Sequence, residues 1–279
     1  MAKIKIVTDS TACLPAAYCA EHDIAVVQLS YTFEGQTVPE GTPEDWSDFY
    51  RRFAVSEDFP KTSQAGIHGF LEAYEQALYR DGYDSVLCMV VSGSVSGTYN
   101  SAVQAARMVE EKRIRVVDSL GGASSLIIMI DRALERRAKG MDIEGLAFFA
   151  RWDAQHVKYQ FTAATLEYLS RGGRLSKAMA MLGGALKILP LIELVEGRME
   201  VTERVRGGEH KVVERMIAKL PPNCVRFGVT HVLAEEYAQQ IASRLREMFP
   251  NAPVRVDQAN PAIGSHLGPG AVGIAAFWE

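Results

Sequence analysis

The chain has 279 residues, 48% of them hydrophobic and 23% charged, so it can bury the core of one large α/β domain or of two smaller domains. Its formal net charge of −4 argues against a general attraction to nucleic acid or to an anionic membrane. No stretch approaches the ~20 apolar residues of a membrane span, and the N-terminus does not resemble a signal peptide. The four cysteines show no metal-binding spacing. We therefore expect a cytoplasmic protein without a metal site.

Strands and helices alternate through the first half of the chain. The sequence predicts strands over residues 3–7, 24–31, 86–91 and 114–117. It predicts helices that start at Thr42, lie around 70–78, follow the turn 92–98 and run through 127–138. The run 86–91 is continuously apolar and rich in β-branched residues, which is typical of a strand buried on both faces. This alternation predicts a mostly parallel sheet covered by helices.

A glycine- and serine-rich turn, residues 92–98, joins the strand 86–91 to the next helix. Backbone N–H groups, hydroxyls and the positive end of a helix would meet there, so the turn could hold a phosphate or a carboxylate. It could equally be an ordinary strand-to-helix turn with serine caps. The turn alone leaves both interpretations open.

The pattern changes near residue 155. Strands are predicted over 159–164, up to 195, and over 199–206, 225–231 and 254–256, with helices over 212–220 and 234–249. A hairpin turn is predicted at Glu196 and Gly197. Strand pairs mixed with helices indicate an α+β second domain, so we divide the chain into domains 1–156 and 157–279.

Several polar residues are candidate anion ligands, and each has a simpler interpretation. Thr62 and Ser63 could donate hydrogen bonds to an anion, or only cap the helix that follows them. Arg171 and Arg174 flank two glycines and could bind a carboxylate or phosphate, or be solvated surface charge. His266 precedes Gly-Pro-Gly and could hydrogen-bond an anion near neutral pH, or be satisfied locally in a loop.

The stretch 178–189 is rich in Met, Ala and Leu and poor in charge. Methionine adapts to irregular apolar shapes, so this stretch could wall a lipid pocket, although a packed core face is the simpler interpretation. No Walker A, GxSxG or GxGxxG motif is present, and no cysteine has a visible catalytic base. The sequence gives only weak indications of an enzyme.

Together these motifs resemble the DegV family over essentially the whole chain. The matching segments are Val7-Thr-Asp-Ser-Thr11, Thr62-Ser-Gln64, Ser96-Gly-Thr-Tyr99, Val117-Asp-Ser119, Leu166-Glu-Tyr-Leu169, Arg171-Gly-Gly-Arg174, Leu189-Pro190, Arg206-Gly207 and His266-Leu-Gly-Pro-Gly270. The resemblance implies two α/β domains with a fatty acid between them and the acyl chain in an apolar tunnel largely in the second domain. It also implies that a separate kinase subunit phosphorylates the bound carboxylate to an acyl phosphate.

The resemblance also implies roles for individual residues. The fatty-acid head group would be held by Thr62, Ser63, Ser92, Gly93, Ser94, Ser96, Gly97 and His266. The pocket wall would include Met181, Leu182, Leu186 and Ile188, while Arg171, Arg174 and Arg206 would lie near the mouth or face the partner. Two departures from the family pattern are Gly93, where many members have serine, and Gly208-Glu-His210, which replaces a usually basic stretch.

We therefore predict a two-domain, DegV-like α/β protein, with a mostly parallel domain followed by an α+β domain. It would bind a long-chain fatty acid as its ligand, need no cofactor, and serve as the non-catalytic, lipid-carrying subunit of a bacterial fatty-acid kinase. Its partners would be the kinase subunit and, transiently, a membrane for lipid exchange, with no nucleic acid. The alternatives are an enzyme acting on a small phosphorylated or carbonyl metabolite, and a regulatory module that senses lipid.

Overall fold

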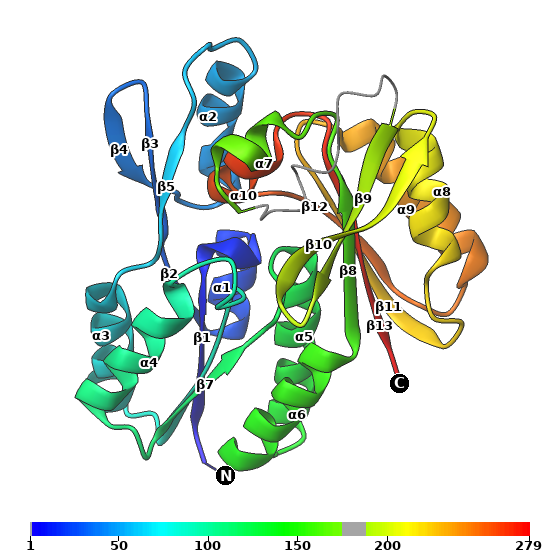
Figure 1. The fold of residues 1–279 in the computed structure, drawn as a ribbon. Coiled ribbons are helices and arrows are strands. Elements are labelled where there is room, and N and C mark those ends of the chain that lie inside the picture. The colour runs from blue at the N-terminus through cyan, green and yellow to red at the C-terminus, as the bar shows by residue number, and fades with distance from the viewer. Residues whose placement is uncertain (1, 175–187) are drawn as a thin grey trace.

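The computed structural model describes residues 2–174 and 188–279 (Figure 1). Its first sheet has four parallel strands in the order β2-β1-β6-β7. These strands are β1 (Ile4–Asp9), β2 (Ile24–Val27), β6 (Ser85–Val90) and β7 (Ile114–Asp118). The helices around the sheet are α1 (Ala16–His22), α3 (Ile67–Glu75), α4 (Thr98–Val109), α5 (Ser124–Ala138) and α6 (Ile143–Gln155). The predicted parallel, helix-covered sheet is confirmed.

Strand β6 shows why this sheet is covered on both faces. Successive side chains of a strand point to opposite faces, and every residue of β6 is buried. Val86 and Cys88 pack into a core with residues of α3 and α4. Leu87 and Met89 pack into a second core with residues of α5 and α6. The continuous apolar run therefore serves two cores, and it carries the turn 92–98 to the carboxyl edge of the sheet.

The second sheet has six strands in the order β10-β9-β8-β13-β11-β12, and only the β11–β12 pair is parallel. Its strands are β8 (Val157–Thr162), β9 (Ile188–Val195), β10 (Arg198–Arg206), β11 (Cys224–His231), β12 (Val254–Gln258) and β13 (Val272–Trp278). Helices α8 (Glu209–Ala218) and α9 (Glu235–Met248) share a core with it. The α+β character is confirmed, as is the hairpin turn at Glu196 and Gly197, both of which have positive φ.

A small antiparallel sheet of order β4-β3-β5 was not predicted. It consists of β3 (Ser30–Phe33), β4 (Gln36–Pro39) and β5 (Lys61–Ser63) and lies beside α2 (Trp46–Phe53) (Figure 1). The single strand predicted over 24–31 is wrong at its end, because the chain leaves the first sheet after Val27 and enters this one at Ser30. The predicted helix start near Thr42 is confirmed, since Thr42 is the N-cap of a 3-10 turn, Pro43–Asp45, that leads into α2.

The two large sheets meet around α5 and a shared apolar core. Ile128 of α5 lies in one cluster with Phe161 of β8, Phe277 of β13 and Phe49 of α2. The chain passes from α6 to β8 at the predicted boundary between 156 and 157, and that division into two domains stays a prediction. The short helices α7 (Glu167–Arg171) and α10 (Pro261–Leu267) pack against each other near α2 (Figure 1). No helix within 2–174 or 188–279 is long and apolar enough to cross a bilayer.

Candidate functional site

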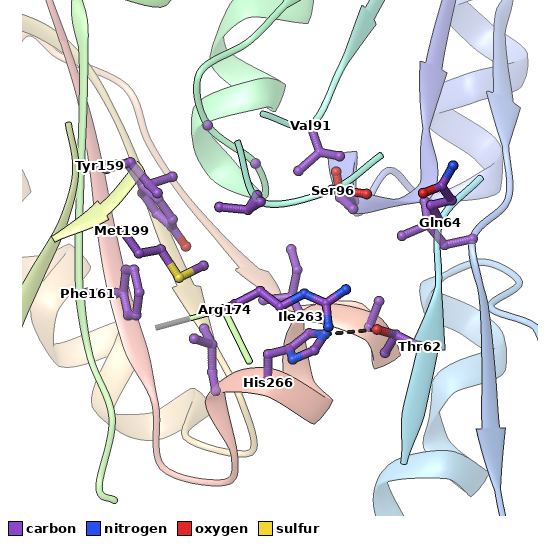
Figure 2. A pocket seen from close by; sticks show the side chains of 18 of the residues that line it. Thr62, Gln64, Val91, Ser96, Tyr159, Phe161, Arg174, Met199, Ile263 and His266 are labelled. Carbon is purple, nitrogen blue, oxygen red and sulfur yellow. Dashed lines mark hydrogen bonds between the residues drawn. The ribbon is translucent and has the colours of Figure 1, made fainter. Parts of the chain in front are cut away.

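A largely apolar cavity lies where the three sheets and α10 meet, with about 740 Å3 of empty space inside it and at its mouth (Figure 2). Its apolar wall is formed by Leu29, Val91, Val95, Tyr159, Phe161, Leu194, Met199, Ala262, Ile263 and Leu267. Its polar lining residues are Thr11, Thr62, Ser63, Gln64, Ser96, Arg174 and His266, next to the backbone of Gly121 and Gly122. Such a mixture of a broad apolar wall with a few polar groups is typical of small-molecule sites.

Thr62 and His266 form the central polar contact of this cavity, although 204 residues separate them in the chain. The hydroxyl of Thr62 lies 2.8 Å from Nε2 of His266, and Figure 2 shows the Arg174 side chain beside this pair. Thr62 belongs to β5, where it pairs with Tyr31 of β3, so its interpretation as a helix cap is wrong. His266 lies on α10 rather than in a loop, so its interpretation as a histidine satisfied locally in a loop is also wrong.

The environment of His266 keeps its imidazole neutral. Burial, and secondly the positive charge of Arg174, lower the pKa of His266 to about 4. A neutral imidazole has one N–H donor and one acceptor nitrogen, which suits a hydroxyl partner such as Thr62. The other ring nitrogen, Nδ1, is buried and has no hydrogen-bond partner among residues 2–174 and 188–279.

The first glycine after Arg171 allows His266 to occupy this place. A Cβ atom on Gly172 would lie 2.0 Å from Nδ1 of His266, so any side chain there would displace the imidazole. On the other side of the contact, Gly268 has φ +78° and lies against the ring of Tyr168, which a Cβ atom would approach to 2.2 Å. These two glycines let the C-terminal end of α7 and the end of α10 approach closely. Gly172 and Gly268 thus have a packing role that the sequence did not reveal.

A buried carboxyl group, Glu40, fixes the N-terminal end of α10. It accepts hydrogen bonds from Nδ2 of Asn260 at 2.7 Å, from the N–H of Ala262 and from the hydroxyl of Ser10. The side chain of Asn260 caps the helix by accepting the N–H of Ile263 at 3.0 Å. Burial, partly opposed by these hydrogen bonds, raises the pKa of Glu40 to about 7. Glu40 therefore joins α10 to the end of β1.

Two further aspartates hold the loops at the carboxyl edge of the first sheet. Asp9 is fully buried and accepts the N–H of Thr11 at 2.8 Å and of Val91 at 2.7 Å, and burial raises its pKa. Asp118 accepts the N–H of Gly93 at 3.1 Å and of Leu120 at 2.9 Å. The ends of β1, β6 and β7 are thus connected through carboxylates that bind backbone N–H groups of the protein itself.

The serine-rich turn presents only its middle to the cavity. Val95 and Ser96 line it, and the Ser96 hydroxyl lies 2.9 Å from that of Thr98. Ser92 is buried and donates to the carbonyl of Gly197 in the β9–β10 hairpin at 2.9 Å. The remaining predicted residues of the turn, Gly93, Ser94 and Gly97, are not among the lining residues. Ser96 is therefore the hydroxyl of this turn that a ligand in the cavity could reach.

Comparison with known proteins identifies the family. The sequence matches the family described as "Uncharacterised protein, DegV family" over residues 3–279. The chain belongs to the DegV family. A DegV domain-containing protein of Halalkalibacterium halodurans is 31% identical over 284 residues, which cover 100% of both chains. A Thermotoga maritima protein named fatty acid-binding protein is 32% identical, over 97% of this chain and 96% of its own.

A solved structure confirms the predicted DegV-like, two-domain α/β fold. DegV of Bacillus subtilis, described as a fatty acid binding protein, superposes with a TM-score of 0.88 over 100% of both chains, at 29% identity. Within this DegV fold, five of the residues predicted for the site line the cavity: Thr62, Ser63, Ser96, Arg174 and His266.

Other predicted residues of this DegV chain lie elsewhere. Arg171 is exposed and pairs with Glu167 at 2.5 Å, and its guanidinium lies over the ring of Phe59. Arg206 lies in a separate surface hollow between β10 and α8. Ile188, at the start of β9, is 37% exposed and is not among the lining residues. The predicted wall residues Met181, Leu182 and Leu186 lie outside the described residues.

Several lining residues were missed because only the pairing of strands brings them together. Tyr159 and Phe161 are two apart in β8 and therefore share a face, a period-2 signal that the sequence contains. Leu194 and Met199 are cross-strand partners in the β9–β10 hairpin. Glu40 gave no local signal of its role. The described part of the chain contains no cluster of three or more His, Cys, Asp or Glu placed to hold a metal ion.

Proposed function

We propose that this chain binds a long-chain fatty acid in the cavity and presents its carboxylate to a separate kinase subunit, which phosphorylates it to an acyl phosphate. The observation that supports this most is the meeting of Thr62 and His266, from distant parts of the chain, at the polar part of an otherwise apolar cavity. A fatty acid has the same division, with a charged head and an apolar chain.

The energetics of the site agree with such a ligand. Each buried CH₂ group of an acyl chain contributes ~0.8 kcal/mol, so the apolar wall alone can supply most of the affinity. A carboxylate that leaves water must regain its hydrogen bonds, or its desolvation cancels much of this gain. The donors that line the cavity include the hydroxyls of Thr62, Ser63 and Ser96 and the neutral imidazole of His266, with Arg174 beside them.

The kinase partner rests on the family resemblance rather than on the cavity. We propose that Arg171 and Arg174, at the C-terminal end of α7 and just beyond it, flank the mouth, and that Arg206 belongs to the surface that meets the kinase. All three are exposed, as a role in electrostatic recognition requires. The head group would then be held by residues of both proposed domains, since Thr62 lies in 1–156 and His266 in 157–279.

Denaturing mass spectrometry of the protein purified from a bacterial host tests the ligand class. The proposal expects one long-chain fatty acid per chain, released on unfolding. A protein that carries a small phosphorylated or carbonyl metabolite instead would support the alternative of an enzyme with its own small-molecule substrate. A protein that stays empty after incubation with a mixture of fatty acids would contradict both the carrier and the lipid-sensing module.

A further inference from the structure

The hydroxyl of Thr98, the first residue of α4, lies between the two segments of the first domain that carry predicted head-group residues. Thr98 is 0% exposed and is not among the residues that line the cavity. Its Oγ1 accepts the N–H of Ala65 at 3.2 Å, directly after the segment 62–64. The same Oγ1 lies 2.9 Å from Oγ of Ser96, which does line the cavity. Thr98 therefore connects the segment of Thr62 to the serine-rich turn.

The direction of the hydrogen bond between Thr98 and Ser96 follows from the partners of each hydroxyl. Among the described residues, Oγ of Ser96 is the only acceptor for the O–H of Thr98, and a buried donor without an acceptor is costly. Thr98 is therefore the donor. Oγ of Ser96 also accepts the backbone N–H of Thr98 at 3.3 Å. A hydroxyl oxygen has two acceptor lone pairs, so both are used and only the O–H of Ser96 is left for a ligand.

We propose that Thr98 is a positioning residue, which directs the O–H of Ser96 into the cavity so that it donates a hydrogen bond to the ligand carboxylate. This inference rests on the proposed function, since it names a residue that orients a donor for the head group. The donors follow one another in one direction, from the Ala65 N–H through the Thr98 O–H to the Ser96 O–H. Hydrogen bonds in such a chain polarise one another, so Ser96 becomes a stronger donor toward a charged acceptor.

A comparison of oleic acid with oleamide separates this role from simple support of Ala65. The two ligands have the same shape, but only the acid is charged. A hydrogen bond to a charged acceptor contributes more than one to a neutral acceptor, so loss of the Ser96 donor weakens binding of the acid more than binding of the amide. Competitive displacement of a fluorescent fatty acid gives both dissociation constants. Their ratio, amide over acid, is the head-group selectivity.

Ser96→Ala should lower the head-group selectivity roughly tenfold. Thr98→Val, which keeps the shape of the side chain, should lower it roughly threefold, because the Ser96 O–H can then rotate among three staggered positions. Thr98→Ser restores the hydroxyl and should keep the wild-type selectivity. In the Ser96→Ala background, Thr98→Val should lower the selectivity no further, because the donor that Thr98 orients is already absent. Loss of support for Ala65 would have the same effect in both backgrounds.

Ser101→Ala is the matched control and should keep the head-group selectivity. Ser101 is buried on α4 and accepts a hydrogen bond from Nε2 of Gln64 at 2.9 Å, so it supports the same segment as Thr98 does. Thr98→Cys, with its weak S–H donor, takes the place of Thr98→Val if that variant does not fold.

Two results would refute the positioning role while the fatty-acid cavity stands. One is an unchanged head-group selectivity in Ser96→Ala or in Thr98→Val. The other is an equal effect of Thr98→Val with and without the Ser96 hydroxyl. If oleic acid does not bind to wild type, the proposed function and this inference fail together.

Discussion

At the scale of single residues, the polar end of the cavity combines the neutral donors Thr62 and His266 with the charged side chain of Arg174. The pKa of His266 lies near 4, so its ring carries no charge near neutral pH and can give one N–H hydrogen bond. Thr62 contributes a hydroxyl that can rotate between His266 and a ligand. A carboxylate held this way is oriented without being paired to a buried counter-ion. Orientation is what in-line phosphoryl transfer demands of its acceptor.

Thr62→Ala and His266→Ala should therefore separate binding from reaction. Loss of one hydrogen bond to a carboxylate costs roughly 1.5–3 kcal/mol, less than burial of a long acyl chain contributes. Both variants should retain bound fatty acid but lose most acyl-phosphate production with the kinase subunit, roughly tenfold or more, because the carboxylate is no longer aligned. Bound lipid is quantified by mass spectrometry and turnover by acyl-phosphate formation.

Ser94→Ala is the matched control for this experiment, because Ser94 is exposed and does not line the cavity. It should retain both lipid and turnover. Unchanged turnover in both Thr62→Ala and His266→Ala would show that these residues only support local structure.

Short sequence motifs predicted which residues could bind an anion, but not which distant segments come into contact. The threonine of 62–64 and the histidine before Gly-Pro-Gly were candidates because their types and positions suggested anion binding. The family resemblance placed both at the head group, but residue patterns alone could not predict their contact, because it depends on the pairing of β5 with β3 and on α10 lying against α7. The serine-rich turn was predicted as a unit. Only folding shows that Ser92 is used internally, by the carbonyl of Gly197, and that Ser96 faces the cavity.

At the scale of elements, α10 decides where His266 lies. This helix has only two turns and is held at its start by Glu40, and near its end by close contact with α7 through Gly172. The hydroxyl of Tyr50 adds a hydrogen bond to the carbonyl of Ala259, just before the helix. A short helix gains little stability from its own backbone, so these tertiary contacts determine its position.

Glu40→Gln should change how stability depends on pH. Burial raises the pKa of Glu40 from its ordinary 4.5 to about 7 in the folded protein. Between these pH values the folded chain keeps a proton that the unfolded chain has released, so the Glu40 contribution to the free energy of unfolding falls as pH rises. Glutamine cannot ionise and lacks this fall. Urea unfolding at several pH values should show wild type losing stability relative to Glu40→Gln between about pH 4.5 and about pH 7.

The exposed Glu57 provides a control, since Glu57→Gln should leave the pH profile of unfolding as it is in wild type. A stability difference between wild type and Glu40→Gln that does not vary with pH would contradict the prediction. It would mean that Glu40 is already ionised in the folded protein at the lower end of this range.

The elements of this chain were predicted unevenly, for physical reasons. Buried strands such as β6 and the hairpin at Glu196 and Gly197 carry strong local patterns, and both were confirmed. Strand β5 has only three residues, all polar, and forms because β3 pairs with it. Its own sequence therefore contains no pattern that predicts a strand. Helix α10 was missed because its seven residues include glycine and proline and are fixed by Glu40 from a distant segment.

At the scale of the whole molecule, polar contacts tie together the parts that surround the cavity. Ser92 binds the hairpin of the second sheet, Ser124 binds Thr230 of β11, and Glu40 binds α10. All three lie in buried surroundings, where a lost hydrogen bond is costly. The cavity is therefore a property of the assembled chain, with lining residues from Thr11 to Leu267. Neither half of the sequence contains the site by itself.

The proposed division of labour with a kinase leads to the last prediction. The chain alone should form no acyl phosphate from ATP and fatty acid, and should form it when a cognate kinase subunit is added. The hollow between β10 and α8 carries the exposed positive charges of Arg204, Arg206 and Lys211. Glu203 and Glu214 also line it. Arg206→Glu should keep bound lipid but reduce turnover with the kinase by roughly tenfold, because like charges would oppose docking.

Arg198, exposed at the opposite end of β10, is the matched control for that charge reversal. Arg198→Glu should leave turnover near that of wild type, since the same change of net charge is made away from the proposed docking surface. Equal loss in both variants would indicate a general effect of charge rather than a local contact. Acyl phosphate produced from ATP by the isolated chain would refute the carrier role itself, because phosphoryl transfer would then belong to this protein and not to a partner.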